Sequence, residues 1–75
     1  MKIEITSGRD GCTIAELGEA DSWNDAASIV KKWVLATRGV MYAPTWTITR
    51  MVNEGYSVVD FGSHMFFARY RGEPR

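Results

Sequence analysis

The chain has little of what builds disulfides, metal sites and membrane spans: it contains one cysteine, one histidine and no long apolar run. A single cysteine excludes a disulfide within the chain. The longest apolar stretches are far shorter than the roughly 20 residues that a membrane-spanning helix needs. No basic segment followed by an apolar run precedes Lys2, which argues against a secretory signal. We therefore expect a cytoplasmic protein, in the host cytoplasm if its source is viral.

Charge of either sign is not in excess, because nine basic residues balance nine acidic ones. A strongly basic nucleic-acid module and an acidic DNA mimic would each show an excess, so the balance favours a protein partner. The charges are separated along the chain: residues 1–25 hold six acids and two bases, whereas residues 26–75 hold seven bases and three acids. The chain is therefore polarised although it is neutral overall.

The length and composition indicate one small folded domain. The chain has 75 residues, of which 45% are hydrophobic and 24% charged, which is too apolar for disorder. A single apolar core is barely sufficient at this length, so self-association or a partner would help. We expect one domain over residues 1–71 and a frayed tail over residues 72–75.

The first expected element is an N-terminal hairpin. Residues 2–6 alternate polar and apolar side chains, and residues 7–11 are rich in turn formers. Residues 12–17 can return antiparallel. Cys12 is then expected to be a half-buried strand residue rather than a reactive thiol.

A capped helix is expected next. Ser22 is a good N-cap, and Asp25 places a carboxylate at the positive end of the helix dipole. Apolar residues then recur with helical spacing, and Arg38 with Gly39 provides a basic last turn and a stop. The pattern predicts a helix from Ser22 to Arg38, followed by a connector from Gly39 to Pro44.

Residues 45–70 predict three short strands separated by two tight turns. If Glu54-Gly55 and Gly62-Ser63 are two-residue turns, Val52 pairs near Ser57 and Val59 opposes Phe66. One face of this meander is then apolar apart from Arg50, and it consists of Trp46, Ile48, Val59, Phe61, Phe66, Ala68 and Tyr70. The opposite face carries Thr47, Thr49, Met51, Tyr56, Val58, Asp60, Met65, Phe67 and Arg69.

These elements predict an α+β domain of order ββαβββ, with one antiparallel sheet and a single helix packed on one face. The core is expected to bury Trp23, Val30, Trp33, Trp46, Ile48, Phe61 and Phe66. One helix cannot cover both faces of the sheet. We therefore expect the other face to lie partly in water and to bind a protein partner, or a second copy, through Met51, Tyr56, Val58, Met65, Phe67 and Arg69. Two alternatives stay open: the N-terminal hairpin or the connector folds over this face, or the turns are three residues long and the residues of the two faces change places.

His64 is the strongest candidate for catalysis. It follows Gly62-Ser63, and Asp60 lies four residues before it, so it could act as a general base for Ser63 or for an RNA 2′-hydroxyl. Adjacent residues of one hairpin rarely reach the geometry of a catalytic triad, so we expect a histidine that is structural or merely exposed, and no enzyme activity. A metal site needs several ligands that converge on one point, and one histidine and one cysteine far apart in the chain do not provide them. We therefore expect no metal and no cofactor.

Nucleic acid is the main alternative partner. The candidate residues are Lys31, Lys32, Arg38, Arg50, Arg69, Arg71 and Arg75, interleaved with Tyr56, Phe67 and Tyr70. On a sheet, such residues can stack bases and hold phosphates of a single strand or an RNA. Lysines on a solvated helix and a cation–π pair between Arg69 and Tyr56 explain the same pattern without a ligand.

The order hairpin, capped helix, meander resembles small phage-encoded inhibitors of host machinery, including some anti-CRISPR proteins and phage inhibitors of bacterial RNA polymerase. The resemblance runs through Ala-Asp-Ser-Trp-Asn-Asp-Ala-Ala at 20–27 and Thr-Trp-Thr-Ile-Thr-Arg at 45–50. It is architectural and transfers no functional residue. It implies action by occupying a surface of a larger protein or nucleoprotein, without catalysis.

A local resemblance to the HicA toxin family covers about a third of the chain, through Asn-Glu-Gly-Tyr at 53–56 and Gly-Ser-His at 62–64, with Phe66. That family cleaves mRNA with a catalytic histidine. Only His64 would correspond, and position 65 holds Met where a second histidine is usual. A ribonuclease is therefore the lesser alternative.

Overall fold

The computed structural model describes residues 1–38 and 46–74, which form one five-stranded antiparallel sheet and one α-helix. The elements are β1 (Lys2–Ser7), β2 (Thr13–Glu19), α1 (Trp23–Arg38), β3 (Thr47–Met51), β4 (Tyr56–Asp60) and β5 (Phe66–Arg71). The strand order is β2-β1-β5-β4-β3, so the hairpin joins the meander where β1 pairs with β5. The α+β fold with one antiparallel sheet is confirmed. The predicted connector, Gly39 to Pro44, lies outside the described residues.

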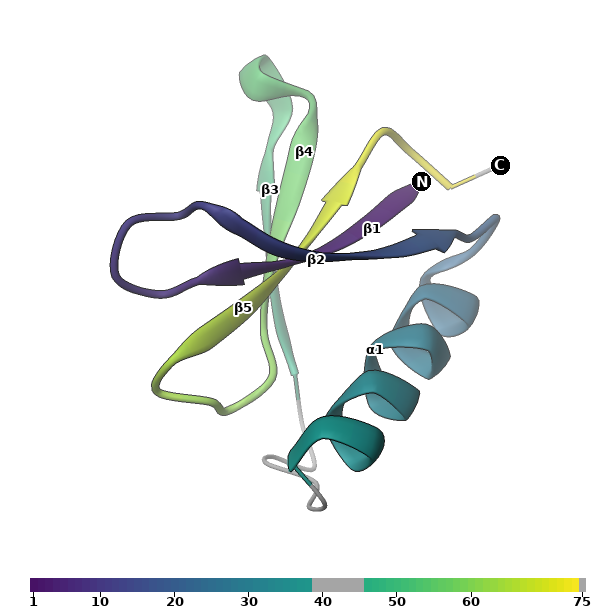
Figure 1. Ribbon diagram of the computed structural model, residues 1–75. Helices are drawn as coiled ribbons and strands as arrows, with labels where there is room; N and C mark the ends of the chain where they lie inside the picture. The colour runs from purple at the N-terminus through teal and green to yellow at the C-terminus, as the bar shows by residue number, and fades with distance from the viewer. Residues whose placement is uncertain (39–45, 75) are drawn as a thin grey trace.

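The sheet is strongly twisted, and α1 lies on one side of it (Figure 1). We call the side that faces α1 the inner face and the opposite side the outer face. The helix begins after Ser22, whose Oγ accepts a hydrogen bond from the backbone N–H of Asp25 at 3.1 Å. This is the expected N-cap, which satisfies a backbone donor that the first helical turn leaves without a partner.

The core lies between α1 and the inner face. Its fully buried members alternate along the strands and recur at helical spacing on α1: Ile3, Ile5, Ala26, Val30, Val34, Val59, Phe61, Ala68 and Tyr70. Two aromatic pairs join the helix to β5: Trp23 with Tyr70, and Trp33 with Phe66, with ring centroids 5.9 Å and 5.7 Å apart. Burial raises the pKa of the Tyr70 hydroxyl to about 12.

The predicted faces of the meander are correct, but the predicted turn lengths are wrong. Ser57 pairs with Arg50 instead of Val52, and Val59 opposes Ala68 instead of Phe66. Each register differs from the expected one by two residues. Because side chains alternate with a period of two along a strand, a shift of two leaves every residue on its predicted face.

The first turn is longer because residues Val52–Glu54 form a single turn of 3₁₀ helix. Gly55 closes this turn in the left-handed conformation, with a φ of 77°, and its N–H donates to the carbonyl oxygen of Met51 at 3.1 Å. A residue with a side chain rarely adopts that φ, which explains the glycine.

Ile48 is not in the core, contrary to expectation: 43% of its surface is exposed. It lies on the inner face of the edge strand β3, whereas α1 packs mainly against β2 and β1 at the other end of the sheet. An open groove of about 250 Å³ between the helix and β3 is lined by residues that include Trp23, Trp46 and Ile48. Trp23, Trp33, Trp46 and Phe66 are only partly buried around the core.

Candidate functional site

All the strand residues predicted to bind a partner lie on the outer face. Met51 pairs with Tyr56, and Val58 pairs with Arg69, on three neighbouring strands. Met65 directly precedes β5 and is 58% exposed. The other residues of the predicted set are half-buried, so the face is partly in water, as expected. We use the name outer-face set for Met51, Tyr56, Val58, Met65, Phe67 and Arg69.

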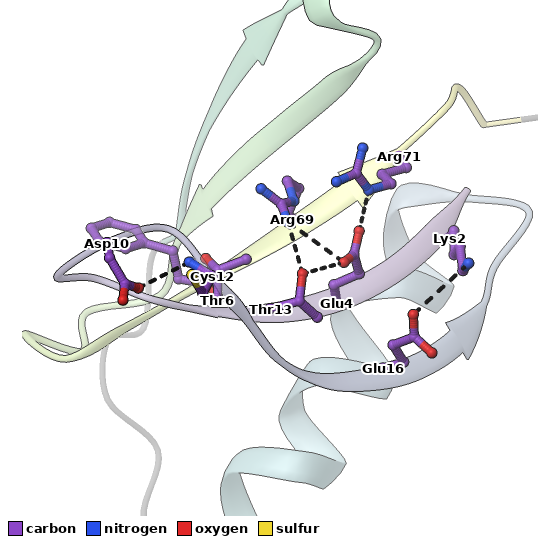
Figure 2. A network of polar contacts seen from close by, with 10 residues as sticks. Lys2, Glu4, Thr6, Asp10, Cys12, Thr13, Glu16, Arg69 and Arg71 are labelled. Carbon is purple, nitrogen blue, oxygen red and sulfur yellow. Dashed lines mark hydrogen bonds and ion pairs between the residues drawn. The ribbon is translucent and has the colours of Figure 1, made fainter.

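A buried carboxylate organises the centre of this face (Figure 2). Glu4, on the outer side of β1, has only 5% of its side chain exposed. Its Oε2 accepts a hydrogen bond from Thr13 Oγ1 at 2.6 Å and lies 3.5 Å from Arg69 Nη2. Its Oε1 accepts a hydrogen bond from Arg71 Nε. Arg69 Nη2 also donates to Thr13 Oγ1 at 2.8 Å, which links three strands through one cluster.

The environment of Glu4 keeps it ionised. Burial alone would raise the pKa of this carboxyl. The hydrogen bonds from Thr13 and Arg71, together with the positive charges of Arg69 and Arg71, outweigh burial and lower the pKa below its ordinary value. Two arginines thus face one buried carboxylate. The cluster of Glu4, Arg69 and Arg71 therefore has a net charge of one positive unit.

Tyr56 makes cation–π contacts with both arginines that bind Glu4. The guanidinium carbon of Arg69 lies 5.5 Å from the centre of the Tyr56 ring, and that of Arg71 lies 5.9 Å away. The predicted cation–π contact between Arg69 and Tyr56 is therefore confirmed. Arg69 is 17% exposed, and its Nε is the one buried side-chain nitrogen or oxygen without a hydrogen-bond partner among the described residues. Each guanidinium group therefore contacts both Glu4 and Tyr56.

The N-terminal hairpin covers the outer face only in part. Gly8 donates its N–H to the carbonyl oxygen of Met65 at 2.8 Å, and a Cβ at Gly8 would lie 3.3 Å from the Phe67 ring. Thr6 Oγ1 donates to the carbonyl oxygen of Phe67 at 3.3 Å. The hairpin therefore shields Phe67 and leaves Met65 exposed.

The basic residues considered for nucleic-acid binding are divided between different surfaces. Lys31 lies on α1 with its Nζ 5.6 Å from the centre of the Trp46 ring, on the helix side of the sheet. Arg50 is on the inner side of β3 and forms an ion pair with Glu73 at 2.6 Å. Among the candidates whose side chains the structure describes, Arg69 and Arg71 share the outer face, and Tyr70 is buried in the core. Arg75 lies outside the described residues.

The candidate catalytic residues are not arranged as a triad. Ser63 Oγ accepts hydrogen bonds from the backbone N–H groups of Met65 and Phe66, both at 3.1 Å. Asp60 Oδ1 accepts the N–H of Gly62 at 2.9 Å. These contacts are local turn hydrogen bonds, and His64 is exposed beside them. No hydrogen bond joins Ser63 or Asp60 to the His64 imidazole among the described residues.

Cys12 is exposed, and it precedes β2 rather than lying half-buried within a strand as expected. Its backbone N–H donates to Asp10 Oδ1 at 3.0 Å, which fixes the hairpin turn. The hydrogen bond from the Cys12 backbone is the main cause of a lowered pKa at the exposed Asp10 carboxyl. Hydrogen bonds that involve the backbone of Ser7, Gly11 and Cys12 therefore hold this corner.

Sequence reasoning missed Glu4, Thr13 and the role of Arg71. Alternation along residues 2–6 places Glu4 opposite the apolar side chains of its strand, but it gives no hint of burial. The missing information is the pairing of β1 with β5, which brings Glu4 opposite Arg69. No local sequence signal reports a contact between residues so far apart in the chain.

Comparison of the chain with protein-family models, with curated proteins and with solved structures finds no match. No helix in residues 1–38 and 46–74 has the length and apolar character needed to cross a membrane. The same residues contain no group of three or more His, Cys, Asp or Glu side chains placed to hold a metal ion.

Proposed function

We propose that the protein is a small non-enzymatic binding protein that acts by occupying a surface of a larger protein or nucleoprotein through its outer face. The phage-type inhibition of host machinery implied by the architectural resemblance is one form of this activity. The observation that carries the proposal is the arrangement of the outer-face set around two arginines held in place by buried Glu4 and by Tyr56.

The residue types of the outer-face set favour a protein partner. Tyrosine, arginine, methionine and phenylalanine are enriched in the cores of protein interfaces, and fixed arginines lose little side-chain entropy on binding. Lys31 and Arg50 lie on the helix side of the sheet and Arg69 lies on the outer face, so these three residues do not form one basic path for a nucleic-acid strand.

The charge of the cluster suggests the chemistry of the partner. Two arginines and one carboxylate leave one positive charge beside the exposed side chain of Met65 and the half-buried ring of Phe67. A carboxylate set among apolar side chains on the partner would complement this pattern, since an arginine fork hydrogen-bonds planar acceptors well.

A pair of matched substitutions tests the proposal. Met65 on the outer face and Leu35 on the helix are both exposed, by 58% and 51%, so Met65→Glu and Leu35→Glu should each leave the fold intact. We expect a bacterial lysate to yield a protein retained by immobilised wild type and by L35E but lost with M65E. Retention by M65E and loss with L35E would place binding on the helix and contradict the proposal.

The nucleic-acid alternative gives a different result. If a single-stranded RNA were the ligand, K31E/K32E or R69E would weaken binding and reduce its salt dependence in a fluorescence-anisotropy titration. Under our proposal K31E/K32E has almost no effect on capture. If the wild type cleaved RNA and the folded His64→Ala variant did not, the result would support the ribonuclease alternative.

A further inference from the structure

The two edges of the sheet differ in how well they are protected against pairing with another strand. At one edge, the register between β1 and β2 shifts twice, and β2 carries Glu16 and Glu19. Irregular registers and charges are the devices by which natural sheets discourage edge pairing. At the other edge, β3 pairs with β4 through five consecutive residues without a register shift. The β3 edge is thus the regular one.

The β3 edge is also open to solvent. Residues 47–50 are all exposed, and no hydrogen bond among the described residues covers the free side of this strand. Two of the five exposed large apolar side chains among the described residues are there: Ile48 at 43%, and Val52, directly after the strand, at 75%. An unpaired strand with exposed apolar side chains is a template for another strand.

The charge on β3 does not oppose self-pairing. Arg50 is the one charged residue in the strand, and its ion pair with Glu73 at 2.6 Å neutralises it. The chain as a whole has a formal net charge of zero, so two copies approach without net repulsion. A second copy of the chain therefore suits this edge better than a strongly charged partner would.

We propose that β3 pairs antiparallel with β3 of a second copy, about a twofold axis that passes beside Thr49. Paired residues must lie on the same face, and full overlap of Thr47–Met51 places Thr49 opposite itself. Thr47 then opposes Met51 of the second copy. On the inner face, Ile48 packs against the aliphatic stem of Arg50 of the second copy, and Val52 approaches its Trp46.

This pairing goes beyond the proposed function. It would join two five-stranded sheets into one continuous sheet and place two outer faces side by side, so a dimer would present its binding surface twice. A five-residue edge buries less than the roughly 1,200 Å² of total surface that stable interfaces need, so the dimer should be weak and dependent on concentration.

Cysteine cross-linking tests the register directly. In a C12S background, Thr49→Cys should form a disulfide-linked dimer on mild oxidation, because opposed antiparallel Cα atoms lie about 4.5 to 5.5 Å apart, within reach of a disulfide. Thr47→Cys is the matched control: it is equally exposed, but its copy in the dimer lies about 14 Å away along the strand. Equal cross-linking of both variants, or none with T49C, would overturn the proposal.

Sedimentation velocity gives the second measurement. Wild type should shift from monomer to dimer as its concentration rises to about 1 mM, and Thr49→Lys should abolish the shift by opposing two ammonium groups at the axis. The fold of T49K is checked by circular dichroism. A wild type that stays monomeric at every concentration contradicts the dimer. A dimer that M65E disperses and T49K does not would place self-association on the outer face instead.

Discussion

The two sides of strand β1 are both buried, but by different means. Ile3 and Ile5 point to the inner face and are covered by the apolar core beneath α1. Glu4 and Thr6 point to the outer face, where α1 does not reach, and still have only 4% and 6% of their surface exposed. Glu4 is contacted there by Thr13 of β2 and by Arg69 and Arg71 of β5 (Figure 2).

The difference shows that burial in a domain this small does not require a second layer on each face. The inner face is stabilised by removing apolar surface from water, and this contribution does not change in acid. The outer face depends on the ion pairs of buried Glu4 with Arg69 and Arg71. Those ion pairs stabilise the fold only while the carboxylate and the arginines are all ionised. The two faces should therefore respond differently to substitution and to acid.

The largest expected effect comes from the inner face. Ile5→Ala should lower the free energy of unfolding by about 3 kcal/mol, because it removes fully buried methyl and methylene groups and leaves a cavity. Urea denaturation followed by circular dichroism measures the change, with Ile5→Val as a milder control. A loss below about 1 kcal/mol would show that the core is less tightly packed than its burial indicates.

Glu4→Gln should lower the free energy of unfolding by an intermediate amount, about 2 kcal/mol at neutral pH, because two arginines lose their buried carboxylate. The pKa of Glu4 is lower in the folded chain than in the unfolded chain, so its contribution is present above the unfolded value near 4.5. That contribution is lost as the pH falls through the lower folded-state pKa. The difference in stability between wild type and E4Q should therefore shrink in acid, and a difference that stays constant with pH would contradict the assignment.

The smallest effect at neutral pH belongs to Tyr70. Its hydroxyl is neutral in both states up to about pH 10, where the unfolded chain begins to ionise while the folded chain holds its pKa near 12. Wild type should therefore lose stability as the pH rises from 10 toward 12, and Tyr70→Phe should lose less over that range. Thermal unfolding at several alkaline pH values measures the difference. Parallel curves for the two proteins would show that Tyr70 is not protected from ionisation.

Local pattern was sufficient to predict the helix and the faces of the meander. Ser22 and the apolar spacing after it predicted α1, and alternation predicted which side of each strand is inward. The first turn was longer than predicted because the 3₁₀ turn at Val52–Glu54 has no strong sequence signal. Both register shifts are of two residues, so every side chain stays on its predicted face. The partner-binding role of the outer-face set stays a prediction.

Two misassigned residues show where local pattern fails. Ile48 has the right parity for the core, but it lies on the edge strand farthest from the strands against which α1 packs. Cys12 was placed in a strand because the hairpin turn was expected to end one residue earlier than it does. Burial depends on which element lies above a residue, and alternation within a strand does not contain that information.

The sequence by itself determined the class of fold, the helix with its cap, and the two faces of the meander, because these follow from periodicity and turn chemistry over a few residues. Only the tertiary structure decided the strand order, and with it the pairing of Glu4 with Arg69 and Arg71 and the exposure of β3. The contacts of Glu4 join residues more than sixty positions apart in the chain, and the exposure of β3 depends on its place at the edge of the sheet, so neither follows from a pattern over a few residues.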